Sequence, residues 1–264
     1  MPEEPLPTPP TLQDSAALIV GGTAGIGLAT ARALARDGVQ RICIVGRNAE
    51  RGEAARAALQ AETAADVRYI QGNPIEADSA TAIAGSAIDA LGRIDILVNT
   101  TAPEVTPEIF TRIPIDDIAR ILTHFVLPSM HMCHAVLPAM VERRSGVIVN
   151  VASDAGKTAT PGEAVIGGSK AAIIMFTRTL AIENKRFGIR ANVITPSLVH
   201  DTPTGQKVMA GGFSTKLFQK AAEAAKLGVP TADDQAELIA FLASPGAARL
   251  TGQAISLNGG ISAA

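Results

Sequence analysis

Aromatic residues are scarce in this chain of 264 residues, at 3% of the composition, with no tryptophan and a single tyrosine, Tyr69. Chemistry that needs a phenol therefore has one candidate in the whole chain. The hydrophobic content of 47% is otherwise aliphatic, and with 18% charged residues it is typical of a globular protein. The length is sufficient for one large α/β domain with a sizeable core.

An excess of positive charge is also missing, since the net charge is −2, and a nucleic-acid partner is not expected. No apolar run reaches the ~18 residues of a membrane span, so a membrane partner is not expected either. Residues 1–15 have neither the apolar core of a signal peptide nor a basic transit pattern, which predicts a flexible tail before a domain at 16–264. The two cysteines, Cys43 and Cys133, fall in apolar segments and indicate a reduced, cytoplasmic protein rather than a disulfide.

What the chain does contain is a glycine-rich turn between a short apolar run and an alanine-rich helical pattern, over residues 16–38. The apolar run at 16–20 predicts a buried strand, and Gly38 is suited to end the following helix. The glycines of the turn are Gly21, Gly22, Gly25 and Gly27. Glycines there let a phosphate approach the backbone, and the N-terminus of the new helix favours its negative charge. An ordinary tight turn is the alternative interpretation.

Strand-like and helical patterns alternate along the rest of the chain. We expect strands at 16–20, 41–45, 67–71, 95–99, 146–151, 190–194 and 254–257, and helices at 25–38, 48–65, 78–91, 115–144, 163–186, 213–225 and 233–243. Asp78 or Ser79 is expected near the third helix cap, and Pro128 and Pro138 are expected to kink or divide the long helix. The alternation predicts an α/β fold: a single-domain, Rossmann-type, doubly wound parallel sheet of about seven strands with helices on both faces.

In such a sheet the ligand lies beyond the carboxyl ends of the strands. Arg47 follows the second strand, where a dinucleotide without a 2′-phosphate usually meets an acidic residue. An arginine can instead pair with a phosphate, which favours NADP(H) as cofactor. A solvated arginine at a helix start is the alternative.

With these motifs the chain resembles the short-chain dehydrogenase/reductase family over about residues 16–260. The resemblance is carried by the glycine turn, by NTTA at 99–102, by IVNVAS ending at Ser153, by IGGSK ending at Lys170, by NVITPSLVHDTP and by LTGQAISLNGG. The pattern SDAG…GEAV…SK also looks like bacterial members that act on cyclic hydroxyacyl thioesters.

The resemblance implies a dinucleotide site with a dozen residues: Gly21, Thr23, Gly25, Ile26, Gly27, Arg47, Asn73, Asn99, Lys170, Pro196, Val199 and Thr202. Val20 stands where the glycine motif usually has a threonine. Asn73 and Pro74 replace the usual aspartate and a residue whose N–H meets adenine. Because proline has no N–H, we expect a looser adenine pocket.

On the catalytic side, the resemblance implies that Ser153 polarises a carbonyl and that Lys170 holds the nicotinamide ribose. The family's catalytic tyrosine maps to Ile166, four residues before Lys170, and its helix asparagine maps to Phe125. An isoleucine has no ionisable proton, so acid–base catalysis there is lost, a contribution typically worth ~10²–10⁴-fold.

Several residues are candidates for the missing acid. His200 follows the sixth strand and is expected over the nicotinamide end, while His124 adjoins Phe125. Asp154 and Glu163 flank the site in sequence, and a carboxyl group with a raised pKa is a further candidate. Surface or structural positions are the alternative for all four. Tyr69 belongs to the third strand and is not expected to reach.

His131 and His134 share a helix face at i, i+3 spacing without an evident third ligand, so no metal site is expected. The substrate loop is expected at about 197–230, with an apolar lid of Phe213, Leu217 and Phe218. The resemblance implies a homodimer or homotetramer, built through the fourth and fifth helices and the last strand.

Three functions remain open on the sequence. The first is an NADP(H)-dependent oxidoreductase of a small, cyclic carbonyl or related C=N or conjugated substrate, with a substitute proton donor. The second is a non-redox cyclase, dehydratase or isomerase on the same fold. The third is a cofactor-binding protein whose catalysis has lapsed.

Overall fold

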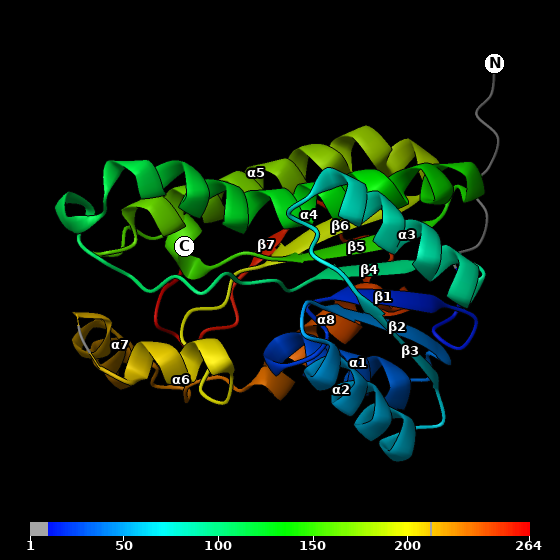
Figure 1. Cartoon of the computed structure of the whole chain (residues 1–264), viewed down its shortest axis with the longest axis horizontal. Helices are drawn as coiled ribbons and strands as arrows, with labels where there is room; N and C mark the ends of the chain where they lie inside the picture. The colour runs from blue at the N-terminus through cyan, green and yellow to red at the C-terminus, as the bar shows by residue number, and fades with distance from the viewer. Residues whose placement is uncertain (1–9, 212) are drawn as a thin grey trace.

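A computed structural model describes residues 10–211 and 213–264 of the chain (Figure 1). A seven-stranded sheet in the order β3-β2-β1-β4-β5-β6-β7 crosses the molecule, and every neighbouring pair is parallel. The strands are β1 (Ala16–Val20), β2 (Arg41–Gly46), β3 (Asp66–Gln71), β4 (Ile96–Asn99), β5 (Gly146–Val151), β6 (Ile189–Ile194) and β7 (Ala254–Ile255). The strand order reverses between β1 and β4, so the doubly wound fold predicted from the alternating pattern is confirmed.

Helices cover both faces of the sheet (Figure 1). On one face lie α1 (Gly25–Arg36), α2 (Ala49–Glu62) and α8 (Ala232–Ala243); on the other lie α3 (Ala77–Leu91), α4 (Ile115–Arg143) and α5 (Ala164–Asn184). Two further helices, α6 (Pro203–Met209) and α7 (Phe213–Ala224), lie beyond one end of the sheet. This end is where the carboxyl ends of the strands converge, so α6 and α7 are placed to cover a ligand.

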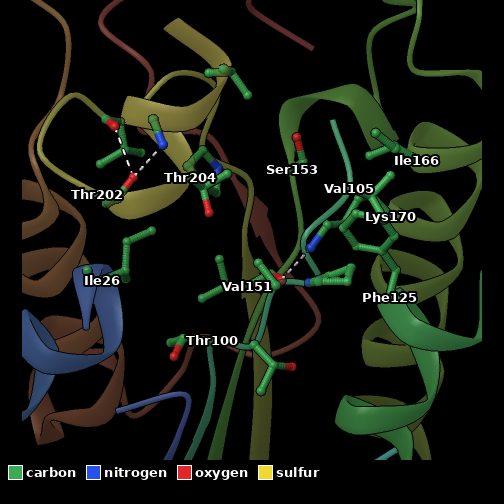
Figure 2. Close-up of a pocket in the computed structure, with 18 of the residues that line it drawn as sticks. Ile26, Thr100, Val105, Phe125, Val151, Ser153, Ile166, Lys170, Thr202 and Thr204 are labelled. Carbon is green, nitrogen blue, oxygen red and sulfur yellow. Dashed lines mark hydrogen bonds between the residues drawn. The ribbon is translucent and has the colours of Figure 1, made fainter. Parts of the chain in front are cut away.

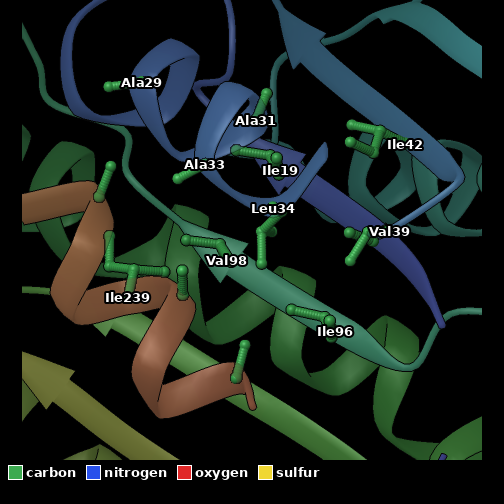
Figure 3. Packing of buried hydrophobic residues seen from close by; sticks show 14 of the residues in the cluster. Ile19, Ala29, Ala31, Ala33, Leu34, Val39, Ile42, Ile96, Val98 and Ile239 are labelled. Atoms are coloured by element: carbon green, nitrogen blue, oxygen red, sulfur yellow. The ribbon is translucent and has the colours of Figure 1, made fainter. Parts of the chain in front are cut away.

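The core is divided by the sheet into two layers, because successive strand residues point to opposite faces. In β1, Ile19 faces the layer under α1 and α8, where Leu34 and Ile239 are buried (Figure 3). Leu18 faces the layer under α3 and α4. All five residues of β1 are fully buried. Because a central parallel strand is covered on both faces, its sequence is a continuous apolar run.

The long helix is not divided at its prolines, whereas Asp78 and Ser79 lie in the first turn of α3, near its cap, as expected. α4 is one undivided helix of 29 residues with Pro128 and Pro138 inside it. Each proline removes one backbone hydrogen bond, but burial of residues such as Met132 and Met140 against the sheet outweighs this loss. The N-cap of α3 is Glu76, and the Ser79 hydroxyl instead accepts the N–H of Asn73 at 3.2 Å.

Part of the segment 1–15, expected to be a flexible tail, is ordered. Residues 1–9 lie outside the described part of the chain. From Thr11 the chain forms a turn, in which the Ser15 hydroxyl donates to the Thr11 carbonyl at 2.7 Å and Leu12 packs on the core. Arg41 donates to the Asp14 carbonyl at 3.2 Å, which fixes this turn to the start of β2.

One helical stretch, Ala164–Phe187, has the length and apolar composition of a membrane span, and 50% of its most apolar window is buried within the protein. It contains α5, which packs against α4 and β6. Its buried face carries Ser169, Lys170 and Thr177 beside the apolar residues, as expected for a helix that covers a sheet and lines a site.

Candidate active site

A cavity of about 1080 Å³, called here the main cavity, lies at the carboxyl ends of the strands. It extends from the glycine turn after β1, past the ends of β4, β5 and β6, to α6 and α7. Figure 2 shows Ile26 and Thr202 on one side of it and Lys170, Ile166 and Phe125 on the other. One continuous space therefore joins the glycine turn to the residues expected to carry the chemistry.

Two positions of the glycine turn, Gly21 and Gly27, accept no residue larger than glycine. Gly21 has a φ of 86°, and a Cβ there would lie 2.7 Å from the Thr100 hydroxyl oxygen. A Cβ on Gly27 would lie 2.5 Å from the same oxygen and against the Gly21 carbonyl. The turn is thus packed directly on the end of β4, which holds the N-terminus of α1 at the cavity wall.

This helix N-terminus is open to a ligand. The N-cap of α1, Ala24, makes no side-chain cap, whereas Asn48 at the start of α2 accepts the N–H of Arg51 at 2.8 Å. The first N–H groups of a helix have no partner within the helix. At α1, Gly25 and Ile26 line the cavity, so an anionic group in this part of it would satisfy these N–H groups.

Ten of the twelve residues predicted to bind the dinucleotide line the main cavity. They are Gly21, Thr23, Gly25, Ile26, Arg47, Asn73, Lys170, Pro196, Val199 and Thr202. Gly27 and Asn99 are not among the described lining residues. Gly27 supports the turn from beneath, as its contacts with Gly21 and Thr100 show.

Asn99 has a different role from the one predicted for it. It is 1% exposed, and its amide nitrogen donates to the Asn150 side-chain oxygen at 2.8 Å. Asn150 in turn donates to the Thr177 hydroxyl at 2.8 Å. In the register of β4 on β5, Asn99 lies opposite Asn150, so the two amides pair inside the protein. The cavity is lined instead by the next residue, Thr100.

A second arginine was missed by the sequence analysis. Arg51 lines the main cavity together with Arg47, beside Gly46 at the end of β2. Arg47 lies in the turn between β2 and the N-cap Asn48, and Arg51 lies in the first turn of α2. The position of both arginines shortly after the second strand was the signal that could have identified the pair from the sequence.

Ser153 follows β5 and caps a short turn at Asp154–Gly156. Its hydroxyl oxygen accepts the N–H of Ala155 at 3.2 Å, and it lines the main cavity (Figure 2). Because the N–H occupies only an acceptor position, the Ser153 O–H stays able to donate to a substrate oxygen.

Lys170 is 6% exposed on α5, and its ammonium group lies in a mixed environment. Its Nζ donates to the Val151 carbonyl at 3.4 Å and lies 5.1 Å from the centre of the Phe125 ring (Figure 2). Burial lowers the pKa of Lys170 to about 8, and the negative charge of Glu163 acts against this shift. Part of the lysine population is therefore neutral near pH 8.

Ile166 and Phe125 lie in an apolar cluster with Ile121 and Val165, called here the α4–α5 cluster. Ile166 is 8% exposed and lines the main cavity four residues before Lys170. Tyr69 is not among the described lining residues: on β3, its hydroxyl lies 3.1 Å from the carbonyls of Gly46 and Asn48. No phenol from the described part of the chain therefore reaches this wall.

His200 is misplaced for the role predicted for it. Its side chain is exposed and is not among the described residues that line the main cavity. The reason is that its loop is tied to the start of α8: the His200 N–H donates to the Pro230 carbonyl at 3.0 Å, and Asp201 accepts the Ala232 N–H at 2.7 Å. His124 is half-buried and does line the cavity, beside Phe125.

The His131 ring nitrogen lies 3.0 Å from the Pro74 carbonyl, while His134 is exposed. Among the described residues, no group of three or more His, Cys, Asp or Glu side chains is arranged to hold a metal ion. His131 is thus held by a backbone contact, and His134 faces solvent.

The two carboxylates that flank the site differ in their surroundings. Asp154 is buried and accepts the Ser262 hydroxyl at 2.6 Å, which ties the C-terminal segment to β5. Glu163 is half-buried at the N-cap of α5 and lines the main cavity. Burial raises the pKa of Glu163 to about 7, helped by the charge of Asp154 and opposed by that of Lys170.

The predicted apolar lid is present in part. Leu217 and Phe218 of α7 line the main cavity, together with Lys207 and Val208 of α6. Phe213 is not among the described lining residues, and its ring lies against Gly162. The short helix α6 was missed because Thr202, its capping residue, was assigned only to the cofactor.

Comparisons with known proteins agree with this geometry. Residues 15–211 match the short chain dehydrogenase family. A 3-oxoacyl-[acyl-carrier-protein] reductase of Chlamydia muridarum is 30% identical over 95% of this chain and 98% of its own. A 7alpha-hydroxysteroid dehydrogenase of Bacteroides fragilis is 32% identical over 92% and 93%. The crystal structure of levodione reductase superposes with a TM-score of 0.88 at 25% identity, over 94% and 97%. The chain therefore belongs to the short-chain dehydrogenase/reductase family of oxidoreductases.

Proposed function

We propose that this protein is an NADP(H)-dependent oxidoreductase that reduces a carbonyl, or a related C=N or conjugated group, of a small cyclic substrate. One observation carries the proposal: a single cavity joins Arg47 and Arg51, the open N-terminus of α1, and the pair of Ser153 and Lys170. The first two features are suited to the phosphates of the cofactor, and the third is suited to a carbonyl oxygen.

The residues present fit a dinucleotide with a 2′-phosphate. The N–H groups at the start of α1 would hold the pyrophosphate, and the guanidinium groups of Arg47 and Arg51 would pair with the 2′-phosphate. Asn73 would accept a hydrogen bond from adenine beside Pro74, and Lys170 would bind ribose hydroxyls. Bound NADPH supplies the hydride, and the protein contributes orientation and electrostatics.

Two groups of the chain act on the substrate carbonyl. The Ser153 hydroxyl donates to its oxygen, and the positive charge of Lys170 stabilises the negative charge that develops there. Ile166 gives this chain an atypical site, because no proton is available at the position where the family has its tyrosine. Reduction must draw its proton from elsewhere in the cavity.

The substrate end of the cavity is mostly apolar. Val105, Phe125 and Ile166 line one wall, and Leu217 and Phe218 of α7 line the cover. Apolar walls with a few polar groups favour a hydrophobic ring held by shape. The names of the relatives, an oxoacyl reductase, a hydroxysteroid dehydrogenase and a levodione reductase, support chemistry at a carbonyl or alcohol.

A second candidate is a non-redox enzyme, such as a cyclase, dehydratase or isomerase, or a cofactor-binding protein without turnover. The α4–α5 cluster favours it, because apolar residues occupy the positions of both the family's tyrosine and its asparagine. Either alternative would keep the dinucleotide site and lose hydride transfer.

Titration of the purified protein with NADPH and NADH, followed by turnover on cyclic ketones, quinones and imines, tests these alternatives. We expect NADPH to bind at least about tenfold more tightly than NADH, since a 2′-phosphate adds charge-assisted hydrogen bonds. Absence of binding would overturn the proposal. Tight NADPH binding without turnover on any member of the panel would favour the second candidate.

We also infer a homodimer or homotetramer that uses the outer face of α5, where Met175 and Ile182 are 59% and 61% exposed. Light scattering on the wild type and on Met175→Glu would test this, and a monomeric wild type would contradict it.

The free, buried thiols of Cys43 and Cys133 support a reduced, cytoplasmic location. Neither nucleic acid nor membrane is part of the proposal; the partner is a small molecule.

A further inference from the structure

The wall of the main cavity around Ile166 is apolar. Phe125, Ile121, Val165 and Ile166 form the α4–α5 cluster, with Val105 and other apolar side chains packed against it. Phe125 also covers Lys170, at 5.1 Å from its Nζ to the ring centre. Hydrocarbon groups neither donate nor accept protons, so a proton that reaches the substrate must come from another side.

Glu163 is on that other side. It stands three residues before Ile166 and seven before Lys170, at the N-cap of α5. Long side chains on a helix lean toward its N-terminus, so a side chain at position 166 extends toward the turn that Glu163 begins. A carboxyl group at Glu163 therefore lies at the end of the helix where a phenol at position 166 would present its hydroxyl.

A second cavity of about 420 Å³ meets the main cavity at this residue. The residues that line both cavities are Ala155, Ala159, Thr160, Pro161 and Glu163. Among these described residues, Glu163 alone carries an ionisable side chain. Its carboxylate makes no hydrogen bond or ion pair with another described residue, so it is free to exchange a proton with either space.

The charges around Glu163 suit a proton donor. Asp154, from the turn after β5, raises its pKa, and Lys170, from α5, lowers it; burial is the largest effect and brings the pKa of Glu163 to about 7. From α4, Arg120 and His124 also line the main cavity. A pKa near the working pH is the most effective value for a general acid or base.

We propose that Glu163 is the acid–base residue of this site, that it donates the proton completing reduction, and that it recovers this proton from solvent through the second cavity. The inference rests on the proposed oxidoreductase function. In the forward step, the carbonyl carbon accepts a hydride, with its two electrons, from the reduced nicotinamide, which is thereby oxidised. The C=O double bond becomes a single bond, and the oxygen, hydrogen-bonded to Ser153, takes the proton of the Glu163 carboxylic acid. In the reverse direction the Glu163 carboxylate accepts the alcohol proton.

The test compares Glu163→Gln with Glu183→Gln, a matched change at an exposed carboxylate at the other end of α5. We expect Glu163→Gln to lower kcat by about 100-fold or more while leaving the dissociation constant of NADPH within about twofold. Glu183→Gln should change neither quantity. His124→Asn tests the competing assignment, in which His124 donates the proton. We expect this variant to retain most of the turnover.

A chemical rescue separates proton donation from a structural role. Glu163→Ala removes the side chain between the two cavities, so added formate or acetate can enter from the second cavity. We expect these acids to restore turnover in Glu163→Ala in proportion to their concentration, and not in Glu163→Gln, where the side chain still fills the space. A direct readout is carbon NMR of labelled glutamate, in which one carboxyl signal should titrate near pH 7 and disappear in Glu163→Gln.

The outcomes separate the inference from the function on which it rests. Wild-type turnover in Glu163→Gln, or loss of turnover in His124→Asn alone, overturns the inference and leaves the oxidoreductase proposal intact. The inference is also overturned by a third combination of results. In it, Glu163→Gln is slow, but formate and acetate do not rescue Glu163→Ala, and the wild type shows no carboxyl signal that titrates near pH 7. A wild-type protein that binds neither nicotinamide cofactor overturns the proposed function, and the inference with it.

Discussion

The two ends of the main cavity are built in different ways. At the dinucleotide end the wall is largely backbone: glycines packed on Thr100 and the open N-terminus of α1. At the reacting end the wall is made of side chains, with Ser153 and Lys170 on one part and the apolar residues of the α4–α5 cluster on another. A backbone site tolerates few changes of residue, whereas a side-chain site can be rebuilt one position at a time. Under the proposed function, this difference accounts for a cofactor site of the family's form beside a reacting end where Ile166 and Phe125 stand in place of polar residues.

Disruption of the backbone end should have the largest effect. In Gly27→Val, the new side chain meets the Gly21 carbonyl and the Thr100 hydroxyl. We expect loss of measurable NADPH binding and a decrease in the free energy of unfolding of about 1–3 kcal/mol. Calorimetry and denaturant titration measure both effects.

Gly85→Ala is the matched control, because a Cβ there has nothing within 4 Å in the middle of α3. It should bind NADPH normally and be stabilised by about 0.5–1 kcal/mol. Normal NADPH binding by Gly27→Val would contradict the view that the turn itself forms the site.

The next largest effect should come from the reacting end of the main cavity, where a tyrosine can be introduced at position 166. If this end differs from the family mainly by which residue supplies the acid, Ile166→Tyr in the Glu163→Gln background should raise reduction of simple ketones by about 100-fold. Turnover of NADPH with a ketone panel measures this gain, and Ile166→Phe controls for the larger ring. An unchanged rate would mean that the surrounding wall, with Phe125 in place of the family's asparagine, was rebuilt for a different substrate.

The arginine pair at the dinucleotide end should set the choice of cofactor. Arg47→Ala removes charge-assisted hydrogen bonds to a 2′-phosphate, so we expect NADPH to bind about 10- to 100-fold more weakly and NADH to change less than about twofold. Arg56→Ala, on the helix that follows Arg47 but paired with Glu53 at 2.7 Å, is the control. Equal losses for both cofactors would refute the assignment of the 2′-phosphate to Arg47.

The smallest effect is a pH dependence of stability that comes from Glu163. Its pKa is about 7 in the folded protein against an ordinary value of 4.5, so the folded state binds more protons between these pH values. The stability of the wild type therefore decreases as pH rises through this window, and Glu163→Gln lacks that decrease. We expect the difference in free energy of unfolding, variant minus wild type, to rise by about 1–2 kcal/mol from pH 4.5 to pH 7.5, measured by urea denaturation. A constant difference would show that the carboxyl group is not perturbed.

Much of the fold followed from local patterns in the sequence. β1 and β5 begin and end at the predicted residues, because a central parallel strand is apolar on both faces and is bounded by turn residues. The errors concern places where distant contacts decide. α4 runs through Pro128 and Pro138 because burial against the sheet offsets two lost hydrogen bonds, and Thr11 to Ser15 is folded because Leu12 reaches the core.

In the candidate site, too, some residues could be placed from local sequence patterns and others depend on distant contacts. Arg47 and Lys170 could be placed from their distance to strand ends and motifs, and both line the main cavity. His200 could not be placed, because the hydrogen bond of its N–H to Pro230 closes a contact between residues 30 positions apart. Asn99 could not be assigned without the register that sets it opposite Asn150.

Local patterns were enough to predict a glycine turn after a buried strand, to identify Ser153 and Lys170, and to show that Ile166 can give no proton. These properties belong to single residues and short spacings. The contact of Phe125 with Lys170, the position of Arg51 beside Arg47 and the position of Glu163 between two cavities depend on how distant segments pack. The physical reason is that burial, and with it the pKa of a buried amine or carboxyl group, depends on which distant segments surround the side chain.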